Sequence, residues 1–484
     1  MSTMTSENPI VSRRTFFQTA VAGTAGLAAL PRLAGCAATD TAQAARRSDG
    51  LFREPSRDLP HRADADVIVC GAGPAGVAAA IAAARAGART RLFDANGCLG
   101  GVWTAGLLTY IFDFDKPGLT REFVRRLDAR DARRNANVSR FVYDPEAMKL
   151  LLEELCAEAR VKTQLHTRVA AAYRDGRRLT TVVTESKSGR EAWSAPVFID
   201  ATGDGDLGAQ AGCGWDFGNP ADGTWQPLTL NALAVVRDVE SLAEYISFYK
   251  NNDARHIESV EAFKRELKRA GVETSYGHPT LFHIRDNLLD VMINHEYGVR
   301  PDNAAQLSEA TVAARAEVHR AVEALRALGG PWKGMQVVAS AEQIGIRDGR
   351  RIHGRYTVTR DDLLSGARHA DAVCRATFNV DIHAHSRELN RRETISHGGF
   401  KTKPYDIPLR ALIAKDADGL LLAGRCISGD FVAHASYRVT GNAVATGEAA
   451  GAVAAFAAMK RCAPHEVEWA EAMKLLDRKA TETR

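Results

Sequence analysis

The sequence lacks paired cysteines, a large net charge, internal repeats and long apolar stretches beyond the N-terminal region, features that mark several classes of protein. Its eight cysteines are scattered with no C-x-x-C pair, so the sequence does not support a thiolate site for zinc or an iron–sulfur cluster. The formal net charge is only +4 over 484 residues, which provides no electrostatic basis for a nucleic-acid partner. Internal repeats are absent, and no apolar stretch beyond the N-terminal region is long enough to cross a membrane. With 45% hydrophobic and 25% charged residues, the composition is that of a globular protein large enough for more than one domain.

The N-terminal region is typical of an export signal. Residues 12–17 read SRRTFF, a twin-arginine motif, and an uncharged stretch rich in alanine and glycine follows at residues 16–30. Residues 33–36 read LAGC and resemble a bacterial lipobox with Cys36 as the lipid-bearing residue, while cleavage near residues 42–44 is the alternative. We expect the twin-arginine translocase to export the protein to the periplasm or the envelope, with a possible lipid attachment to the membrane at Cys36.

A strand–helix–strand unit follows the N-terminal region. Residues 66–70 (DVIVC) are a short β-branched run suited to a buried parallel strand, residues 77–86 are an alanine-rich helix, and residues 90–94 (TRLFD) are a second strand. The sequence between the first strand and the helix, residues 71–76, is GAGPAG and matches G-x-G-x-x-G. Its place at a strand–helix junction is that of a dinucleotide-binding turn.

The residues of this turn have separate physical roles. Gly71 permits the tight turn, Gly73 lets the backbone approach a pyrophosphate, and Gly76 lets the helix pack on the strand. The helix N-terminus stabilises the anion. Asp94 ends the second strand and is placed to bind ribose hydroxyls.

A second G-x-G-x-x-G occurs at residues 203–208 (GDGDLG), directly after the predicted strand 196–200. Its turn carries two acids, Asp204 and Asp206, which would repel a pyrophosphate. No acid-terminated strand follows at suitable spacing, so we do not interpret it as a second dinucleotide site.

The remaining patterns divide the rest of the chain. Paired strands are predicted at residues 169–172 and 179–184, and residues 224–335 change to amphipathic helices with aromatic residues, which suits a substrate domain. A closing alanine-rich helix is predicted at residues 441–459. The expected parts are a signal peptide (1–36), a linker (37–62), the first part of the nucleotide-binding domain (63–223), a substrate or cap domain (224–335), the returning part of the nucleotide-binding domain (336–462) and a C-terminal tail helix (463–484).

Four stretches together resemble the FAD-dependent oxidoreductase family of the two-dinucleotide-binding-domain flavoproteins. They are residues 66–94 with Gly100-Gly101, residues 199–207 (IDATGDGDL), residues 344–356 (IGIRDGRRIHGRY) and residues 422–428 (LAGRCIS). The resemblance implies bound FAD and an α/β fold in which a Rossmann-like FAD-binding domain carries an inserted α+β substrate domain. It does not imply a substrate. The family often has Glu where this chain has Asp94, and either carboxylate can hold a ribose.

The resemblance also implies where individual residues lie. Val169 would present its backbone to the adenine, Arg425 or Asp430 would lie near the phosphate–ribityl chain, and the amides around Gly441 would face the flavin pyrimidine. A helix N-terminus there suits the negative charge of a reduced flavin. The predicted FAD contacts are Gly71, Gly73, Pro74, Ala75, Gly76, Asp94, Gly100, Gly101, Val169, Ala201, Thr202, Gly203, Asp204, Gly424, Arg425, Gly441, Asn442 and Ala443.

Candidate catalytic residues stand late in the chain. A neutral histidine can accept a substrate proton, and an arginine can fix a carboxylate or polarise a carbonyl. Arg351 has an alternative role as the ion-pair partner of Asp348 at a domain junction. His383 and His385 have no third ligand at convincing spacing, so no metal site is predicted. The predicted catalytic residues are His434, Arg438, His383 and Arg351.

The function that we expect is that of an FAD-dependent oxidoreductase of the cell envelope. It would transfer a hydride between an organic small-molecule substrate and FAD, with an envelope electron acceptor as a possible partner. The alternatives are a flavin-dependent isomerase or hydratase and, from another class, a ligand-binding surface lipoprotein with a vestigial nucleotide fold.

Overall fold

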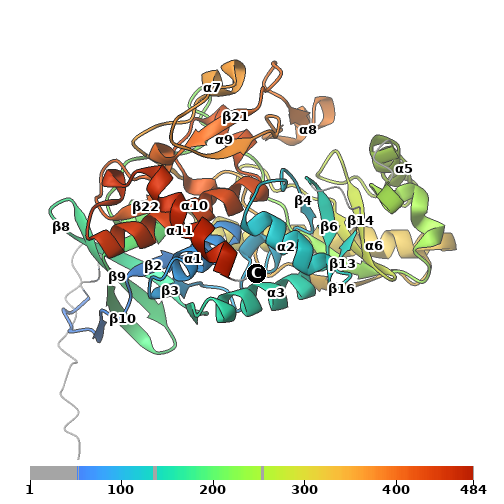
Figure 1. Ribbon diagram of the computed structural model, residues 1–484. Coiled ribbons are helices and arrows are strands. Elements are labelled where there is room, and N and C mark those ends of the chain that lie inside the picture. The colour runs from blue at the N-terminus through green and yellow to red at the C-terminus, as the bar shows by residue number, and fades with distance from the viewer. Residues whose placement is uncertain (1–51, 53, 135–138, 252–254, 483–484) are drawn as a thin grey trace, which may run out of the picture. The chain divides into compact units, whose positions relative to one another are not determined.

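A five-stranded parallel sheet lies at the centre of the computed structural model, which describes residues 52, 54–134, 139–251 and 255–482 (Figure 1). The residues of β2 and β11 are all buried, as expected for strands covered on both faces. The twin-arginine motif and Cys36 lie outside the described residues. In spatial order the strands are β22 (Leu420–Leu422), β11 (Val197–Asp200), β2 (Val67–Cys70), β3 (Thr90–Phe93) and β7 (Lys162–Gln164).

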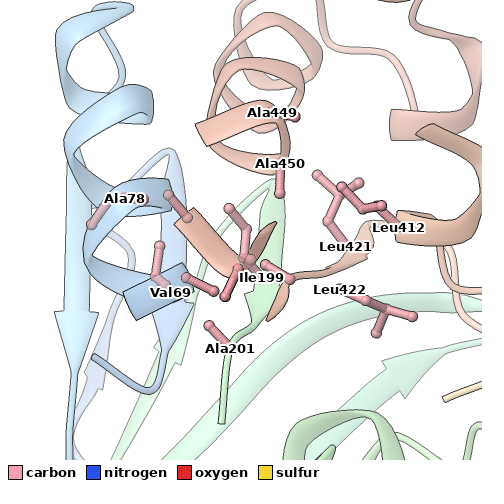
Figure 2. Packing of buried hydrophobic residues seen from close by; sticks show 14 of the residues in the cluster. Val69, Ala78, Ile199, Ala201, Leu412, Leu421, Leu422, Ala449 and Ala450 are labelled. Atoms are coloured by element: carbon pink, nitrogen blue, oxygen red, sulfur yellow. The ribbon is translucent and has the colours of Figure 1, made fainter. Parts of the chain in front are cut away.

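Two alanine-rich helices, α1 (Pro74–Arg85) and α10 (Thr440–Lys460), pack on this sheet and on each other. A Cβ on Gly447 would lie 2.1 Å from the carbonyl oxygen of Ala75, and one on Gly451 would lie 2.2 Å from that of Ala79. The two helices therefore touch backbone to backbone. Figure 2 shows Ala450 of α10 in the same buried cluster as Ile199 and Leu421 of the sheet.

A second sheet contains the two paired strands predicted at residues 169–172 and 179–184. Its antiparallel part is β8 (Arg168–Asp175), β9 (Arg178–Ser186) and β10 (Gly189–Ser194), and β1 (His61–Arg62) pairs in parallel with β10. The predicted pairing is confirmed, because β8 and β9 form a hairpin in which Asp175 pairs with Arg178. Within residues 59–484, which form one unit, this sheet lies at the opposite end from α5 and α6 (Figure 1).

The middle region combines an antiparallel sheet with two helices. The sheet order is β14 (Thr280–Arg285), β15 (Leu288–Met292), β13 (Ala232–Val235) and β16 (Gln336–Ser340), and the helices are α5 (His256–Arg269) and α6 (Ala304–Leu328). Because β16 pairs with β13, the sheet extends beyond the boundary predicted at residue 335. The helical pattern of the sequence did not indicate these strands. They pack against α5 and α6 around Trp332.

The other elements connect these layers. A three-stranded sheet comprises β4 (Tyr110–Ile111), β6 (Phe141–Tyr143) and β5 (Arg133–Arg134), with α2 (Leu119–Asp128) and α3 (Pro145–Glu158) beside it in the chain. The other strands and α-helices are α4 (Asp206–Gln210), β12 (Trp215–Asp216), β17 (Arg351–Ile352), α7 (Arg360–Ser365), β18 (Ala372–Ala376), β19 (Ile382–His383), α8 (Arg387–Arg392), β20 (Ile395–Ser396), β21 (Tyr405–Pro408), α9 (Phe431–Tyr437) and α11 (Trp469–Glu482). Among the described helices, none is both long and apolar enough to span a bilayer.

Candidate active site

The turn between β2 and α1 is built by close backbone packing at two of its glycines. Gly71 has a φ of +96°, and a Cβ there would lie 2.4 Å from the carbonyl oxygen of Ala201. A Cβ on Gly76 would lie 1.8 Å from the carbonyl oxygen of Gly71. These two glycines are therefore required by the protein's own packing, whatever binds at the turn.

Gly73 differs, since a Cβ there would meet no atom within 4 Å. It caps the N-terminus of α1 with φ −67°, so neither packing nor backbone strain explains a glycine at this position. Beside it, a Cβ on Gly101 would lie 3.0 Å from the Gly73 Cα, and the Gly100 amide donates to the Ala72 carbonyl at 2.8 Å. The fold thus brings together two glycine motifs and an open helix N-terminus, a cradle suited to a pyrophosphate.

Asp94 lies under this cradle. Its carboxylate accepts hydrogen bonds from the Ala72 amide at 2.5 Å and the Asn96 amide at 2.7 Å, which holds the glycine turn against the end of β3. Burial raises the pKa of Asp94, while these hydrogen bonds oppose the rise. Each carboxylate oxygen retains acceptor capacity for a ribose hydroxyl.

The N-terminus of α10 forms the second part of the site. Gly424 (φ +78°) lies between the two helices, since a Cβ there would approach Ala75 of α1 at 2.8 Å and Ala443 of α10 at 3.6 Å. The amides of Gly441 and Asn442 belong to the first turn and have no intrahelical partner, whereas that of Ala443 donates to Val439 at 3.2 Å. Of the three predicted amides, that of Ala443 is therefore already engaged. The Asn442 side chain is buried, and its Nδ2 has no partner.

We predicted that Asp204 and Asp206 would repel a pyrophosphate at the second glycine turn, but in the structure each carboxylate is paired with an arginine. Asp204 pairs with Arg425 at 2.8 Å, and Asp206 pairs with Arg350 at 2.9 Å, so both acids are neutralised. The Ile352 side chain packs against the turn, since a Cβ on either Gly205 or Gly208 would lie 2.8 Å from it.

Two further predicted FAD contacts have partners within the protein. Thr202 donates from its amide and its hydroxyl to Asp200 at 3.0 and 2.7 Å. The carbonyl of Val169 accepts from Gln210 Nε2 at 3.1 Å.

A buried polar cluster gathers around Asp381. Arg438 Nη2 donates to the Asp381 carboxylate at 2.9 Å, and His383 Nε2 lies 3.2 Å from the same oxygen. Gln226 Oε1, from the middle region, accepts from the His383 amide at 3.1 Å. Two predicted catalytic residues, His383 and Arg438, therefore share one carboxylate.

The protonation states in this cluster follow from burial and charge. Burial and the nearby Arg347 lower the pKa of His383 to about 4, so its imidazole is neutral near pH 7. Burial would raise the pKa of Asp381, but His383, Arg438 and Arg347 outweigh it and lower that pKa. The cluster therefore holds an ionised carboxylate beside a neutral imidazole whose Nδ1 has no hydrogen-bond partner.

Two residues that sequence reasoning missed complete the cluster. The ring of His295 lies 5.0 Å from that of His383 and 4.1 Å from that of Tyr276, centroid to centroid. His295 is buried, its Nε2 has no partner, and burial lowers its pKa well below the usual value. The available sequence signal was weak: His295 follows the β15 run by a few residues, in a region predicted to be helical.

The other two predicted catalytic residues have different surroundings. Arg351 donates to Gly429 O at 3.1 Å, Asp348 Oδ1 at 3.1 Å and Gly218 O at 2.9 Å. It makes the ion pair with Asp348 that we gave as its alternative role. His434 is fully buried with neither ring nitrogen paired, and burial lowers its pKa well below the usual value. Within the described residues no group of three or more His, Cys, Asp or Glu is arranged to hold a metal.

The fold and this site define a dinucleotide-binding α/β protein with a buried polar cluster between its nucleotide-binding and middle regions. A family model described as FAD dependent oxidoreductase matches residues 66–476, and the chain belongs to this family. FAD is accordingly its cofactor. The open space at Gly73, the two helix N-termini and the unpaired Nδ2 of Asn442 fit that group.

Solved structures show similarity at low identity. A geranylgeranyl bacteriochlorophyll reductase-like protein from Thermoplasma acidophilum is 13% identical with a TM-score of 0.43, covering 88% of this chain and 84% of that one. The flavin-dependent brominase Bmp2 is 10% identical with a TM-score of 0.45, covering 86% and 83%. The p-nitrophenol 4-monooxygenase PnpA from Pseudomonas putida DLL-E4 is 11% identical with a TM-score of 0.38, covering 62% and 70%. No curated protein matches the chain.

Proposed function

We propose that this FAD-dependent oxidoreductase transfers a hydride between an organic small molecule and FAD, with the cluster around Asp381 handling the accompanying proton. The observation that carries the proposal is the concentration of buried polar atoms without partners in this cluster, which include Gln226 Nε2, His295 Nε2, His383 Nδ1 and Arg438 Nε. Buried polar atoms are nearly always paired, so an unpaired group of them indicates a place for a ligand.

Three residues of the chain have separate roles in the proposed proton transfer. FAD supplies the hydride donor and acceptor when it is bound. His383 is neutral and can accept a substrate proton at Nδ1, while Asp381 holds the other ring nitrogen and stabilises the positive charge that the ring gains. Arg438 keeps Asp381 ionised and in place.

The test is anaerobic mixing of the purified holoprotein with a library of sugars, steroids and small acids. Absorbance would be followed at the flavin bands. We expect one class to bleach the flavin and an acceptor to restore the colour. Product formation without any bleaching in single-turnover mixing would instead support an isomerase or hydratase. Specific binding without turnover would support a ligand-binding protein.

We also propose export by the twin-arginine route, which rests on the SRRTFF motif and the apolar stretch that follows it. Changing Arg13 and Arg14 together to Lys should leave the precursor in the cytoplasm, and normal export of that variant would refute the proposal. A separate Cys36→Ala variant tests the lipid anchor. Unchanged membrane attachment of this variant would exclude Cys36 as the anchor.

A further inference from the structure

We propose that the substrate carries a carboxylate and that Arg347 binds it. The inference rests on the proposed function, since it concerns what enters the cluster around Asp381. Arg347 lies in the loop before β17, and its charge acts on His295, His383 and Asp381 alike. Its hydrogen bonds place it beside the cluster: Nη1 donates to the carbonyl of Pro227, which follows Gln226, and to Thr229, whose hydroxyl donates to the Asn294 carbonyl next to His295.

The first argument is a count of charges. Arg438 of the cluster, and Arg351 and Arg425 outside it, each have a carboxylate partner, whereas no described carboxylate lies within 4.0 Å of Arg347. The neighbouring rings do not change the balance, because His295 and His383 are neutral. Their pKa values are lowered mainly by burial. The three pairs are Arg438 with Asp381 at 2.9 Å, Arg351 with Asp348 at 3.1 Å and Arg425 with Asp204 at 2.8 Å.

The surroundings of Arg347 make this excess charge costly. Burial, and then the positive charge of Arg438, lower the pKa of Arg347 to about 10. Arg347 is partly buried, and a charge that loses much of its contact with water is ordinarily paired with an opposite charge. The missing partner is therefore an anion that arrives with a ligand.

The second argument is the geometry of the guanidinium. Both hydrogen bonds of Arg347 come from Nη1, which donates to Pro227 O and to Thr229 Oγ1, each at 2.8 Å. Nε and Nη2 donate to none of the described residues. These two nitrogens form one edge of the guanidinium and donate in parallel, which matches the two oxygens of a carboxylate. The bonds of Nη1 hold that edge in a fixed orientation.

The third argument is the neighbourhood of the free edge. His295 Nε2 and His383 Nδ1 are unpaired atoms of buried rings that Arg347 influences electrostatically. A carboxylate on Arg347 would leave an adjoining carbon or hydroxyl of the same molecule near these nitrogens. The substrate class that fits is thus a small organic acid that reacts at a carbon near its carboxylate.

The experiment uses the oxidised holoprotein and matched pairs of probes. Acetate, benzoate and succinate are titrated against acetamide, benzamide and succinamide, with binding followed by the flavin difference spectrum and by calorimetry. We expect at least one acid to bind about tenfold or more tightly than its amide. Arg347→Gln should weaken that acid by about tenfold to a hundredfold, the usual effect of losing a charged hydrogen-bond partner. Arg347→Lys keeps the positive charge but lacks the two parallel donors, so its affinity for the acid should lie between those of the wild type and of Arg347→Gln.

Arg326→Gln is the matched control, because Arg326 is exposed on α6 and away from the cluster. FAD occupancy is measured first for every variant. Equal binding of acid and amide by the wild-type protein overturns the proposal even if the Arg347 variants fail to fold. Binding of chloride as tight as that of acetate also overturns it, because the site would then not select a carboxylate.

A remaining source of negative charge is reduced FAD itself. If Arg347 served as its counter-ion, Arg347→Gln would lower the flavin midpoint potential and leave the affinity for acids unchanged, which would overturn the proposal. The proposed function fails separately. A wild-type protein that binds acids selectively but whose flavin no compound bleaches would retain this inference as a binding site and refute the redox role.

Discussion

Substitution by alanine should affect two glycines of one turn differently, lowering stability at Gly76 and FAD affinity at Gly73. A methyl group on Gly76 would lie 1.8 Å from the Gly71 carbonyl oxygen, whereas one on Gly73 would meet no atom within 4 Å. Gly76→Ala must therefore move backbone by more than about 1 Å to reach van der Waals contact. Overpacking of this kind costs about 1–3 kcal/mol of the free energy of unfolding, and rigid backbone on both sides favours the upper end.

Gly73→Ala should leave the flavin-free protein about as stable as the wild type. Alanine restricts the unfolded chain, which contributes about 0.4–1 kcal/mol. Losing glycine at the helix N-cap opposes this by a similar amount, up to about 1 kcal/mol. The added methyl group instead occupies the space beside Gly101 that we assign to the pyrophosphate. FAD affinity should fall by about tenfold to a hundredfold, which corresponds to about 1.4–2.7 kcal/mol.

Urea unfolding of the flavin-free proteins, followed by circular dichroism, gives the stability of each variant. Calorimetric titration with FAD gives the affinity. Gly73→Glu extends the series, because its bulk and negative charge against the pyrophosphate should abolish FAD binding. Full FAD affinity in Gly73→Ala together with full occupancy in Gly73→Glu would refute the assignment of the cradle, and unchanged stability of Gly76→Ala would refute the packing argument.

Three further predictions follow from the buried acids and the second turn. Glu448 of α10 has its pKa raised to about 7 by burial, with the Leu119 amide opposing the shift. The folded state then binds this proton more tightly than the unfolded state, so stability falls as the pH rises from about 4.5 to 7. Glu448→Gln should therefore gain up to about 3 kcal/mol relative to the wild type at pH 8 in urea unfolding, but not at pH 4. No gain at pH 8 would contradict the raised pKa of Glu448. Asp381→Asn should retain FAD but lower kcat on the order of 100-fold. Because His383 has a pKa of about 4, protonation of its ring should lower the wild-type kcat only below about pH 5. An acid limb near pH 6.5 that Asp381→Asn abolishes would show that His383 is not the neutral ring described above. NADH and NADPH should reduce the flavin slowly in stopped-flow mixing, because the turn at residues 203–208 is closed by Ile352. Reduction on the order of 10 per second would show a second dinucleotide site.

Local pattern in the sequence determined the nucleotide-binding half of this protein. The apolar runs of β2 and β3, the glycine turn and the alanine-rich α1 lie within a few tens of residues of each other, so their periodicity and turn chemistry predict both the elements and their contacts. The same holds for α10, whose glycines and alanines predict a helix buried against another backbone.

Only the tertiary structure decided the chemistry of the second half. His295 and His383 are far apart in the chain, and no local pattern places one ring 5.0 Å from the other. Nor could spacing tell that Arg351 is fully engaged by Asp348 and two carbonyls while Arg347 keeps a free edge. The physical reason is that charge pairing and burial depend on neighbours supplied by distant segments, whereas strand, helix and turn are specified by neighbours along the chain.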